Sequence, residues 1–277
     1  MRIHLPLLGG CKVCCLSILV AFSCPHRAIS QPELSQPVKA LKRFQVPEAK
    51  QGVAVDADFF YVINDRSITK HQKSDGKQVA AWQDEEGQIQ HLNSGVVIAG
   101  KLYCAHSNYP ESPMASSIEI FQTTTLTHIG NHSIGILAGS ATWVDFWNDY
   151  WWVGFAHYSG KGASEGKDNR WSVVVKFDKE WRQVESWLFP QPLLENFAPK
   201  SNSGGSWGTG NLLYCSGHDK AELYLLKLPD KGFTLQHVGT IPAAFPGQGF
   251  ALDRTSKVPL VYGINRSEKQ VVVFSIK

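Results

Sequence analysis

The sequence predicts an all-β protein, a five-bladed β-propeller whose last blade is closed by an N-terminal strand. A related unit recurs five times along the 277 residues, each copy holds several short strand-like runs, and the last copy lacks one strand. A period of about 50 residues with several strands per copy is typical of propellers, which repeat one sheet around an axis. The copies are marked by the runs YVIN (61–64), YCAH (103–106), VGFAH (153–157), YCSGH (214–218) and YGIN (262–265).

Each of the first four copies contains four short runs rich in Val, Ile, Tyr, Phe and Trp, separated by Gly, Asn or Asp turns. Such runs predict strands joined by hairpins. No amphipathic helix of useful length is expected. The predicted strands are 51–56, 59–64, 68–72 and 78–82 in copy one, 94–98, 102–106, 117–122 and 126–130 in copy two, 141–145, 150–157, 172–178 and 183–188 in copy three, and 205–208, 212–217, 222–228 and 234–241 in copy four.

The fifth copy has only three predicted strands, at 249–252, 260–265 and 270–276, and the sequence given stops there. The segment 38–46, which precedes copy one, alternates well enough to supply the fourth strand. An open ring would leave two unpaired sheet edges, so closure by this segment is expected. The predicted domain organisation is a signal peptide at 1–30 and a single five-bladed propeller domain at 31–277.

The first thirty residues have the features of a secretory signal peptide. Basic residues precede a short apolar run, 13–22, and the small residues of Ala28-Ile-Ser30 offer a cleavage site. The apolar run is too short to span a bilayer. The protein is therefore expected to be secreted or periplasmic, and the alternative is a lipoprotein anchored at Cys24.

The basic charge belongs to this segment. Removing residues 1–30 removes Arg2, Lys12 and Arg27 and no acidic residue, so the formal charge falls from +3 to 0. A neutral chain with no basic run does not favour nucleic acid as a partner, because that binding depends on neutralising phosphates. No later segment is apolar for long enough to predict a membrane span, and a monomer is expected.

Only Cys104 and Cys215 remain after the signal segment, at equivalent places in copies two and four. Strands two blades apart are too distant for a disulfide, which needs Cα atoms within about 7 Å. These cysteines are expected to be small buried side chains.

Three histidines are the strongest candidates for chemistry. In a propeller the loops that enter the first strands and those that leave the second strands share one face, so His106, His157 and His218 are expected to converge on a central pocket. A set of three imidazoles binds a divalent transition metal and leaves a position open for water or substrate. Without a metal, histidine suits proton abstraction and return. None of these three histidines belongs to an HxxxH or CxxC spacing, so no local motif supports the metal independently.

Polar residues on the same face are predicted to orient a substrate, and Asp219 to orient His218 or contact the substrate. Trp207 is the best candidate for stacking on a ligand ring. Asn64 and Asn265 have the alternative of serving only as turn residues, as predicted for Asp56, Asp145 and Asp253 on the opposite face. The predicted substrate-binding residues are Asn64, Asn93, Asn202, Trp207, Gln248 and Asn265.

Several stretches resemble a bacterial exported β-propeller family often labelled cycloisomerase. They are QGVAVD (51–56), HLNSGV (91–96), LYCAHSNYP (102–110), GSATWVD (139–145), FAHY (155–158) and GHD (217–219). The resemblance covers nearly the whole of residues 31–277 and implies the propeller fold, whereas the label does not secure the reaction and no catalytic residue is carried over from it. Secreted glutaminyl cyclases of plants are similar in architecture, with a pocket richer in carboxylates.

The leading hypothesis is an exported propeller enzyme that acts on a small polar organic molecule or sugar by acid–base or metal-assisted chemistry. An isomerase, a lyase or a lactone-forming or lactone-opening enzyme fits these residues, whereas glycoside hydrolysis normally requires a pair of carboxylates. The alternatives are a noncatalytic propeller that binds a sugar or another small ligand, and a protein-interaction platform.

Overall fold

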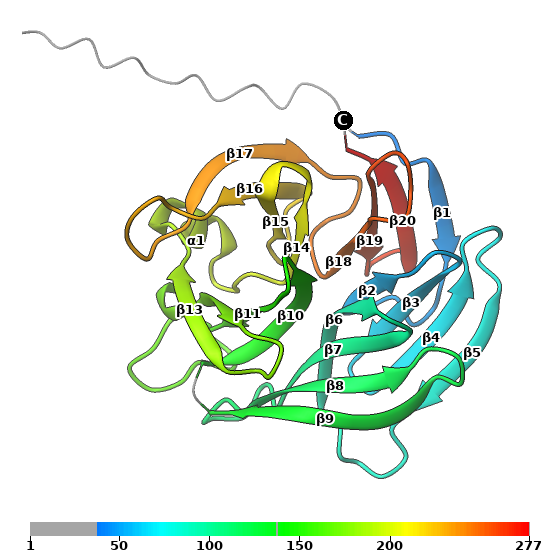
Figure 1. Ribbon diagram of the computed structural model, residues 1–277, viewed down its shortest axis with the longest axis horizontal. Coiled ribbons are helices and arrows are strands. Elements are labelled where there is room, and N and C mark those ends of the chain that lie inside the picture. The colour runs from blue at the N-terminus through cyan, green and yellow to red at the C-terminus, as the bar shows by residue number, and fades with distance from the viewer. Residues whose placement is uncertain (1–37, 137, 277) are drawn as a thin grey trace, which may run out of the picture. The chain divides into compact units, whose positions relative to one another are not determined.

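The computed structural model describes residues 38–136 and 138–276. Within them, five four-stranded antiparallel sheets form a ring (Figure 1), so the predicted five-bladed β-propeller is confirmed. The predicted signal peptide at 1–30 and the alternative anchor Cys24 lie outside the described residues, and the boundary at residue 30 stays a prediction.

The first three blades follow the chain without crossovers, from the innermost strand to the outermost. Their strands are β2 (Gly52–Val55), β3 (Phe59–Asn64), β4 (Ser67–Gln72) and β5 (Gln78–Gln83) in blade 1, β6 (His91–Ile98), β7 (Lys101–Ser107), β8 (Ser116–Gln122) and β9 (Thr127–Gly135) in blade 2, and β10 (Ser140–Trp147), β11 (Tyr150–Ala156), β12 (Val173–Phe177) and β13 (Gln183–Leu188) in blade 3.

The last blade joins the two ends of the domain, as the sequence predicted. Strand β1 (Lys42–Gln45), which lies within the predicted strand 38–46 and is shorter than it, pairs antiparallel with β20 (Gln270–Ser275), so that Arg43 lies opposite Val272. This pairing covers the edge that β20 would otherwise expose. The remaining strands are β14 (Gly204–Gly208), β15 (Leu212–Ser216), β16 (Glu222–Lys227) and β17 (Gln236–Pro242) in blade 4, and β18 (Phe250–Asp253), β19 (Leu260–Asn265), β20 (Gln270–Ser275) and β1 (Lys42–Gln45) in blade 5.

One short helix, α1 (Gln191–Phe197), was not predicted. It lies in the connection between blades 3 and 4, and it buries Leu193, Leu194 and Phe197 in the core between those blades. Its seven residues span only about two turns, too few for a clear apolar period. Two single-turn 3₁₀ segments, Asn169–Trp171 and Thr209–Asn211, complete the helical structure of the described residues.

The core consists mainly of five apolar clusters, each between two neighbouring blades. Side chains alternate across each strand, so neighbouring residues serve different clusters. On β3, Phe60 and Val62 pack toward blade 5, whereas Tyr61 and Ile63 pack toward blade 2. Each blade is therefore apolar on both faces, which explains why the strands read as continuous apolar runs.

The expectation for the two cysteines is confirmed. Cys104 and Cys215 are free thiols with no exposed surface, and burial raises the pKa of both. Packing between the blades therefore holds the described ring together without a disulfide.

Two glycines accommodate the largest buried side chain between blades 3 and 4. A Cβ atom on Gly205 would lie 2.3 Å from Cε2 of Trp143, and one on Gly154 would lie 2.0 Å from its Nε1. Trp143 is completely buried, so its ring has no free space into which it can shift.

We expect Gly205→Ala to lower the free energy of unfolding by about 1–3 kcal/mol, because the added methyl group overpacks this contact. Urea denaturation measures the change. Gly239→Ala is the matched control, since a Cβ there meets no atom within 4 Å on outer strand β17. Equal stability of the two variants would contradict the packing argument.

Candidate functional site

The five blades share a polar pocket of about 360 Å³ at the mouth of the central channel, here called the central pocket. The loops that enter the inner strands form its floor, because these loops lie closest to the axis. Each blade contributes amide or hydroxyl groups there: Gln51, Asn93, Thr142, Asn202, Ser203 and Gln248. The size is within the usual range for small-molecule sites.

A histidine–carboxylate pair lies at one side of the central pocket. His91, at the start of β6, places Nδ1 2.9 Å from Oδ1 of Asp65, in the turn after β3. A carboxylate only accepts, so Nδ1 carries the proton of the neutral ring and Nε2 keeps its lone pair. Asn93 Nδ2 lies 3.3 Å from Nε2. The pair therefore fixes the tautomer that a general base requires.

Asp65 is held as a carboxylate. Burial by itself raises the pKa of Asp65, but hydrogen bonds from His91, Lys50 and Gln51 outweigh burial. The net result is a pKa well below the ordinary value for Asp. Asp65 therefore stays negative beside His91 and stabilises an imidazolium there when His91 takes up a proton.

A second pair of the same kind involves His218, which follows β15 in blade 4. Its Nδ1 donates to Oδ1 of Asp219 at 2.6 Å, so that Nε2 again keeps the lone pair. His218 lines the central pocket, whereas Asp219 is 73% exposed. This hydrogen bond supports the expected role of Asp219 in orienting His218. The central pocket has two oriented imidazoles, from blades 2 and 4.

The side chains that line the central pocket carry excess positive charge. Four basic residues, Lys50, Lys161, Lys200 and Arg266, and one carboxylate, that of Asp65, are among them. Lys50 forms an ion pair with Asp65, which leaves three cations without a carboxylate among the lining residues. Such a pocket attracts an anion.

Arg266 is the most firmly positioned of these cations. Its Nη2 donates to Oε1 of Gln51 at 3.1 Å and to Oε1 of Gln248 at 3.4 Å, and its Nε donates to the carbonyl of Lys50 at 3.1 Å. Burial lowers the pKa of Arg266, although the group remains a cation because free guanidinium titrates far above neutral pH. A bound anion would offset the cost of this burial.

Two tyrosines form part of the wall. The Tyr109 ring lies 5.1 Å from the rings of both His91 and Tyr158. Tyr158 is only 8% exposed, and burial raises its pKa to about 12, so it stays a neutral hydroxyl. These rings lower the local water content beside His91.

A much smaller cavity, with a volume of about 20 Å³, lies between the inner strands. Asp145, 1% exposed, accepts from the backbone N–H of Trp207 at 2.7 Å and from Ser206, and pairs with Arg254. Asp145 therefore ties inner strands together and does more than stabilise the predicted turn.

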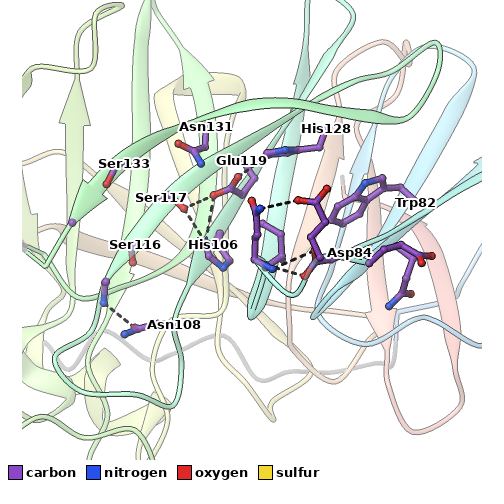
Figure 2. Close-up of a pocket in the computed structure, with 17 residues that line it drawn as sticks. Trp82, Asp84, His106, Asn108, Ser116, Ser117, Glu119, His128, Asn131 and Ser133 are labelled. Carbon is purple, nitrogen blue, oxygen red and sulfur yellow. Dashed lines mark hydrogen bonds and ion pairs between the residues drawn. The ribbon is translucent and has the colours of Figure 1, made fainter.

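His106 does not reach the central pocket. It lines a larger pocket of about 610 Å³, here called the blade 1–2 groove, which Figure 2 shows. Nδ1 of His106 lies 2.8 Å from Oγ of Ser117, and its Nε2 accepts from the backbone N–H of Gln90 at 3.2 Å. Glu119 lies beside this pair, with Oε1 3.4 Å from Nδ1.

His157 occupies a third place. His157 is 4% exposed. It lines a separate pocket together with Met114, Glu165 and Lys167, which lie in the β7–β8 and β11–β12 connections. Its Nδ1 has no hydrogen-bond partner, and burial and the charge of Lys167 lower its pKa. His157 is therefore a neutral, enclosed imidazole.

The expected convergence of the three histidines is wrong, and with it the proposed metal site formed by His106, His157 and His218. Among residues 38–136 and 138–276, no group of three or more His, Cys, Asp or Glu side chains is placed to hold a metal ion. The physical reason is register. His106 lies within β7, whereas His157 and His218 follow the ends of β11 and β15 by one and two residues.

The predicted amide residues divide into two groups. Asn93 and Gln248 line the central pocket. Asn202 lines it too, but its amide group is bonded to Trp143 and to the carbonyls of Gly204 and Ser216. Asn64 and Asn265 lie outside it, where each side-chain oxygen accepts a backbone N–H, from Asp65 and Glu268 respectively. These two are turn residues, the alternative stated above.

The expected role of Trp207 in the central pocket is wrong. Trp207 is 2% exposed, its ring lies 4.7 Å from that of Trp152, and it borders a pocket formed by the β10–β11 and β14–β15 turns. Those turns lie at the opposite end of the inner strands. Inner-strand side chains point between blades, so an aromatic ring there packs against the next blade.

The sequence reading left out the roles of Asp65, His91, Lys50 and Arg266. No local sequence pattern pairs His91 with Asp65, because the two residues are 26 positions apart. The available signal was positional, since each of these residues stands next to a predicted inner-strand entrance or second-strand exit.

No protein-family model and no curated protein sequence matches the chain. Solved structures match its fold. A glutaminyl cyclase from Myxococcus xanthus aligns with a TM-score of 0.55 at 11% identity, covering 87% of this chain and 100% of that one. A PQQ-bound aldose sugar dehydrogenase from Streptomyces coelicolor aligns with a TM-score of 0.52 at 12% identity, covering 83% and 78%. At these identities the similarity shows the β-propeller fold alone.

In the described part of the chain, no helix is long and apolar enough to cross a membrane.

We expect Asp65→Asn to lower the free energy of unfolding at pH 7, and the difference from the wild type to shrink as the pH falls below about 4. The folded-state pKa of Asp65 is depressed, so its contribution is present above the unfolded pKa and is lost on protonation. Urea denaturation at several pH values measures this. Asp230→Asn, at an exposed site, is the control. A pH-independent difference would contradict the assignment.

Proposed function

We propose that this propeller is an enzyme that moves a proton on a small anionic organic molecule bound in the central pocket. One observation carries the proposal: the imidazole of His91 is oriented by the Asp65 carboxylate in a pocket whose other charged side chains are cations. An oriented, neutral imidazole is the most common general base in proteins.

His91 is the proposed base. Its Nε2 would remove a proton from a substrate carbon or hydroxyl, and the resulting imidazolium would be stabilised by Asp65. His218, when it starts as the imidazolium with Nδ1–H donating to Asp219, would deliver its Nε2 proton to a second position of the substrate, and solvent would then exchange protons with both imidazoles. Two imidazoles from different blades allow removal and return at different atoms, which is what an isomerase or a lyase requires.

The basic residues are proposed to bind a substrate carboxylate. Arg266 presents a planar guanidinium suited to a carboxylate, and Lys161 and Lys200 add point charges. The same groups would stabilise negative charge that builds up on the substrate when the proton leaves. The expected substrate is therefore a small carboxylic acid or lactone.

The family resemblance supports the fold alone, so the reaction is proposed from the side chains of the central pocket. The two structural neighbours are named as enzymes, a glutaminyl cyclase and an aldose sugar dehydrogenase. Their similarity indicates that this fold accommodates enzyme sites; the choice of reaction depends on the side chains of this chain. A noncatalytic propeller that binds a small anion in the central pocket is the alternative.

We also propose that the protein is exported through the signal segment at 1–30 and acts outside the cytoplasm as a monomer. The composition of that segment supports export, with the lipoprotein anchored at Cys24 as the alternative. Nucleic acid is not a proposed partner.

Hydrogen–deuterium exchange tests the catalytic proposal without knowledge of the product. In D₂O, the enzyme should replace carbon-bound protons next to the carboxyl or carbonyl group of its substrate, which proton NMR detects across a panel of small carboxylic acids and lactones. We expect His91→Gln to slow this exchange by about 10²–10⁴-fold, the usual contribution of a general base.

His237→Gln is the matched control, because His237 is exposed on outer strand β17. Its exchange rate should equal that of the wild type. Acids that bind without exchange or turnover would favour the noncatalytic alternative. Exchange that is unaffected by His91→Gln would contradict the role of His91.

Arg266→Gln is expected to weaken binding of the anion about tenfold or more, since a hydrogen bond to a charged group contributes about 1.5–3 kcal/mol. Isothermal titration with an acid from the panel measures the change. Arg43→Gln, an exposed arginine on β1, should bind as the wild type does. Unchanged affinity in Arg266→Gln would contradict carboxylate binding in the central pocket.

A further inference from the structure

The blade 1–2 groove, about 610 Å³, is larger than the central pocket, and the central-pocket chemistry does not use it. One wall is the face of blade 2 that looks toward blade 1, with side chains from β7, β8 and β9. The other is Trp82 on β5 and the connection from β5 to β6 (Figure 2). The groove lies between two blades and away from the axis.

The floor of the groove is a fixed hydrogen-bond network. Glu119 is 2% exposed, and its carboxylate accepts from Oγ of Ser117 and from Nε2 of His128 at 2.8 Å. Burial raises the pKa of Glu119, but hydrogen bonds from His106, Ser117 and His128 outweigh it and leave the pKa below the ordinary value. These groups hold one another in place, so the floor is preorganised.

The connection from β5 to β6 is also held in one shape. Oδ1 of Asp84 accepts from the backbone N–H of Gly87 at 3.1 Å, and its Oδ2 accepts from the N–H of Ile89 at 2.9 Å and from Arg66 at 3.0 Å. The carboxylate of Asp84 is thereby paired, and it shapes the wall that faces Glu119 across the groove in Figure 2.

The rim offers an aromatic ring and neutral polar groups. Trp82 is half-buried, and its ring centroid lies 4.7 Å from that of Phe121 with the two rings inclined at 68°, a contact that positions the indole. The side chains of Gln83, Gln88, Asn131 and Ser133 are exposed around it. Amides and hydroxyls both donate and accept, which matches the hydroxyl groups of a sugar, and an indole face suits the apolar C–H face of a sugar ring.

The charge of the groove is opposite to that of the central pocket. Its lining residues include the carboxylates of Asp84, Glu85, Glu86 and Glu119, and none of the described residues that line it is Lys or Arg. Coulomb repulsion therefore disfavours the anions that the central pocket attracts. The groove therefore disfavours an anionic ligand, and the neutral amides and hydroxyls of its rim suit an uncharged one.

We propose that the blade 1–2 groove binds a neutral saccharide. Trp82 stacks on one sugar ring, Gln88, Asn131 and Ser133 bond its hydroxyls, and the Glu119 network supplies the rigid floor. The site is separate from the central pocket and independent of the proposed proton transfer. The sugar-binding role considered for Trp207 is thereby assigned to Trp82, on a different blade.

The test uses the full chain with three neutral disaccharides, maltose, cellobiose and N,N′-diacetylchitobiose, and with the anionic cellobionate. Saturation-transfer NMR detects binding, and titration calorimetry gives the affinity. We expect at least one neutral disaccharide to bind, and cellobiose to bind more tightly than cellobionate in the His91→Gln, Arg266→Gln background, where the central pocket is impaired.

We expect Trp82→Ala to weaken that binding about tenfold or more. Trp171→Ala is the matched control, because Trp171 is 53% exposed on the rim of blade 3. If Trp82→Ala fails to fold, the pair Asn131→Ala and Ser133→Ala tests the same site from exposed positions on β9. The His91→Gln variant should bind the sugar as the wild type does.

Three results would overturn the proposal. They are no binding of any neutral disaccharide up to about 10 mM, equal affinity in the wild type and the rim variants, and loss of binding in His91→Gln. The last would place the sugar in the central pocket. If the proton-exchange experiment fails, the result of the sugar-binding experiment is unaffected. The two proposals can therefore be tested separately.

Discussion

The structure depends on apolar packing between neighbouring blades. Every blade is covered on its two faces by its two neighbours. Side chains along a strand alternate between these two interfaces, as Phe60 and Tyr61 do on β3. A sheet packed on both faces cannot end freely, so the last blade must meet the first. The β1–β20 pairing completes the ring within one blade, and it places the entrances of all five inner strands around one axis.

This packing decides which side chains can meet. Residues that enter the inner strands, such as Gln51 and Gln248, lie at the axis whatever the length of each repeat. Side chains on the second strands instead point into the interfaces between blades. His106 therefore belongs to the blade 1–2 groove although it stands in the marked run of its repeat, and His218 reaches the central pocket only because it lies beyond its strand.

The two pockets consequently differ in chemistry. The central pocket collects cations from loops of several blades, and each of its two imidazoles is oriented by a carboxylate. The groove collects carboxylates from a single connection and one strand, around the buried Glu119. Charge therefore distinguishes the two pockets, although the connection from β5 to β6 contributes lining residues to both.

The sequence by itself determined the five-fold repeat, the order of the strands, the closing strand and the pocket face, because these follow from local periodicity and from the cost of an open sheet edge. It also placed Asn93, His218 and Gln248 on that face. Only the tertiary structure decided that Asp65 and His91 pair, that Trp207 is buried, and that His106, His157 and His218 lie apart. Those outcomes depend on one- and two-residue differences in register and on contacts between distant segments, which no local pattern records.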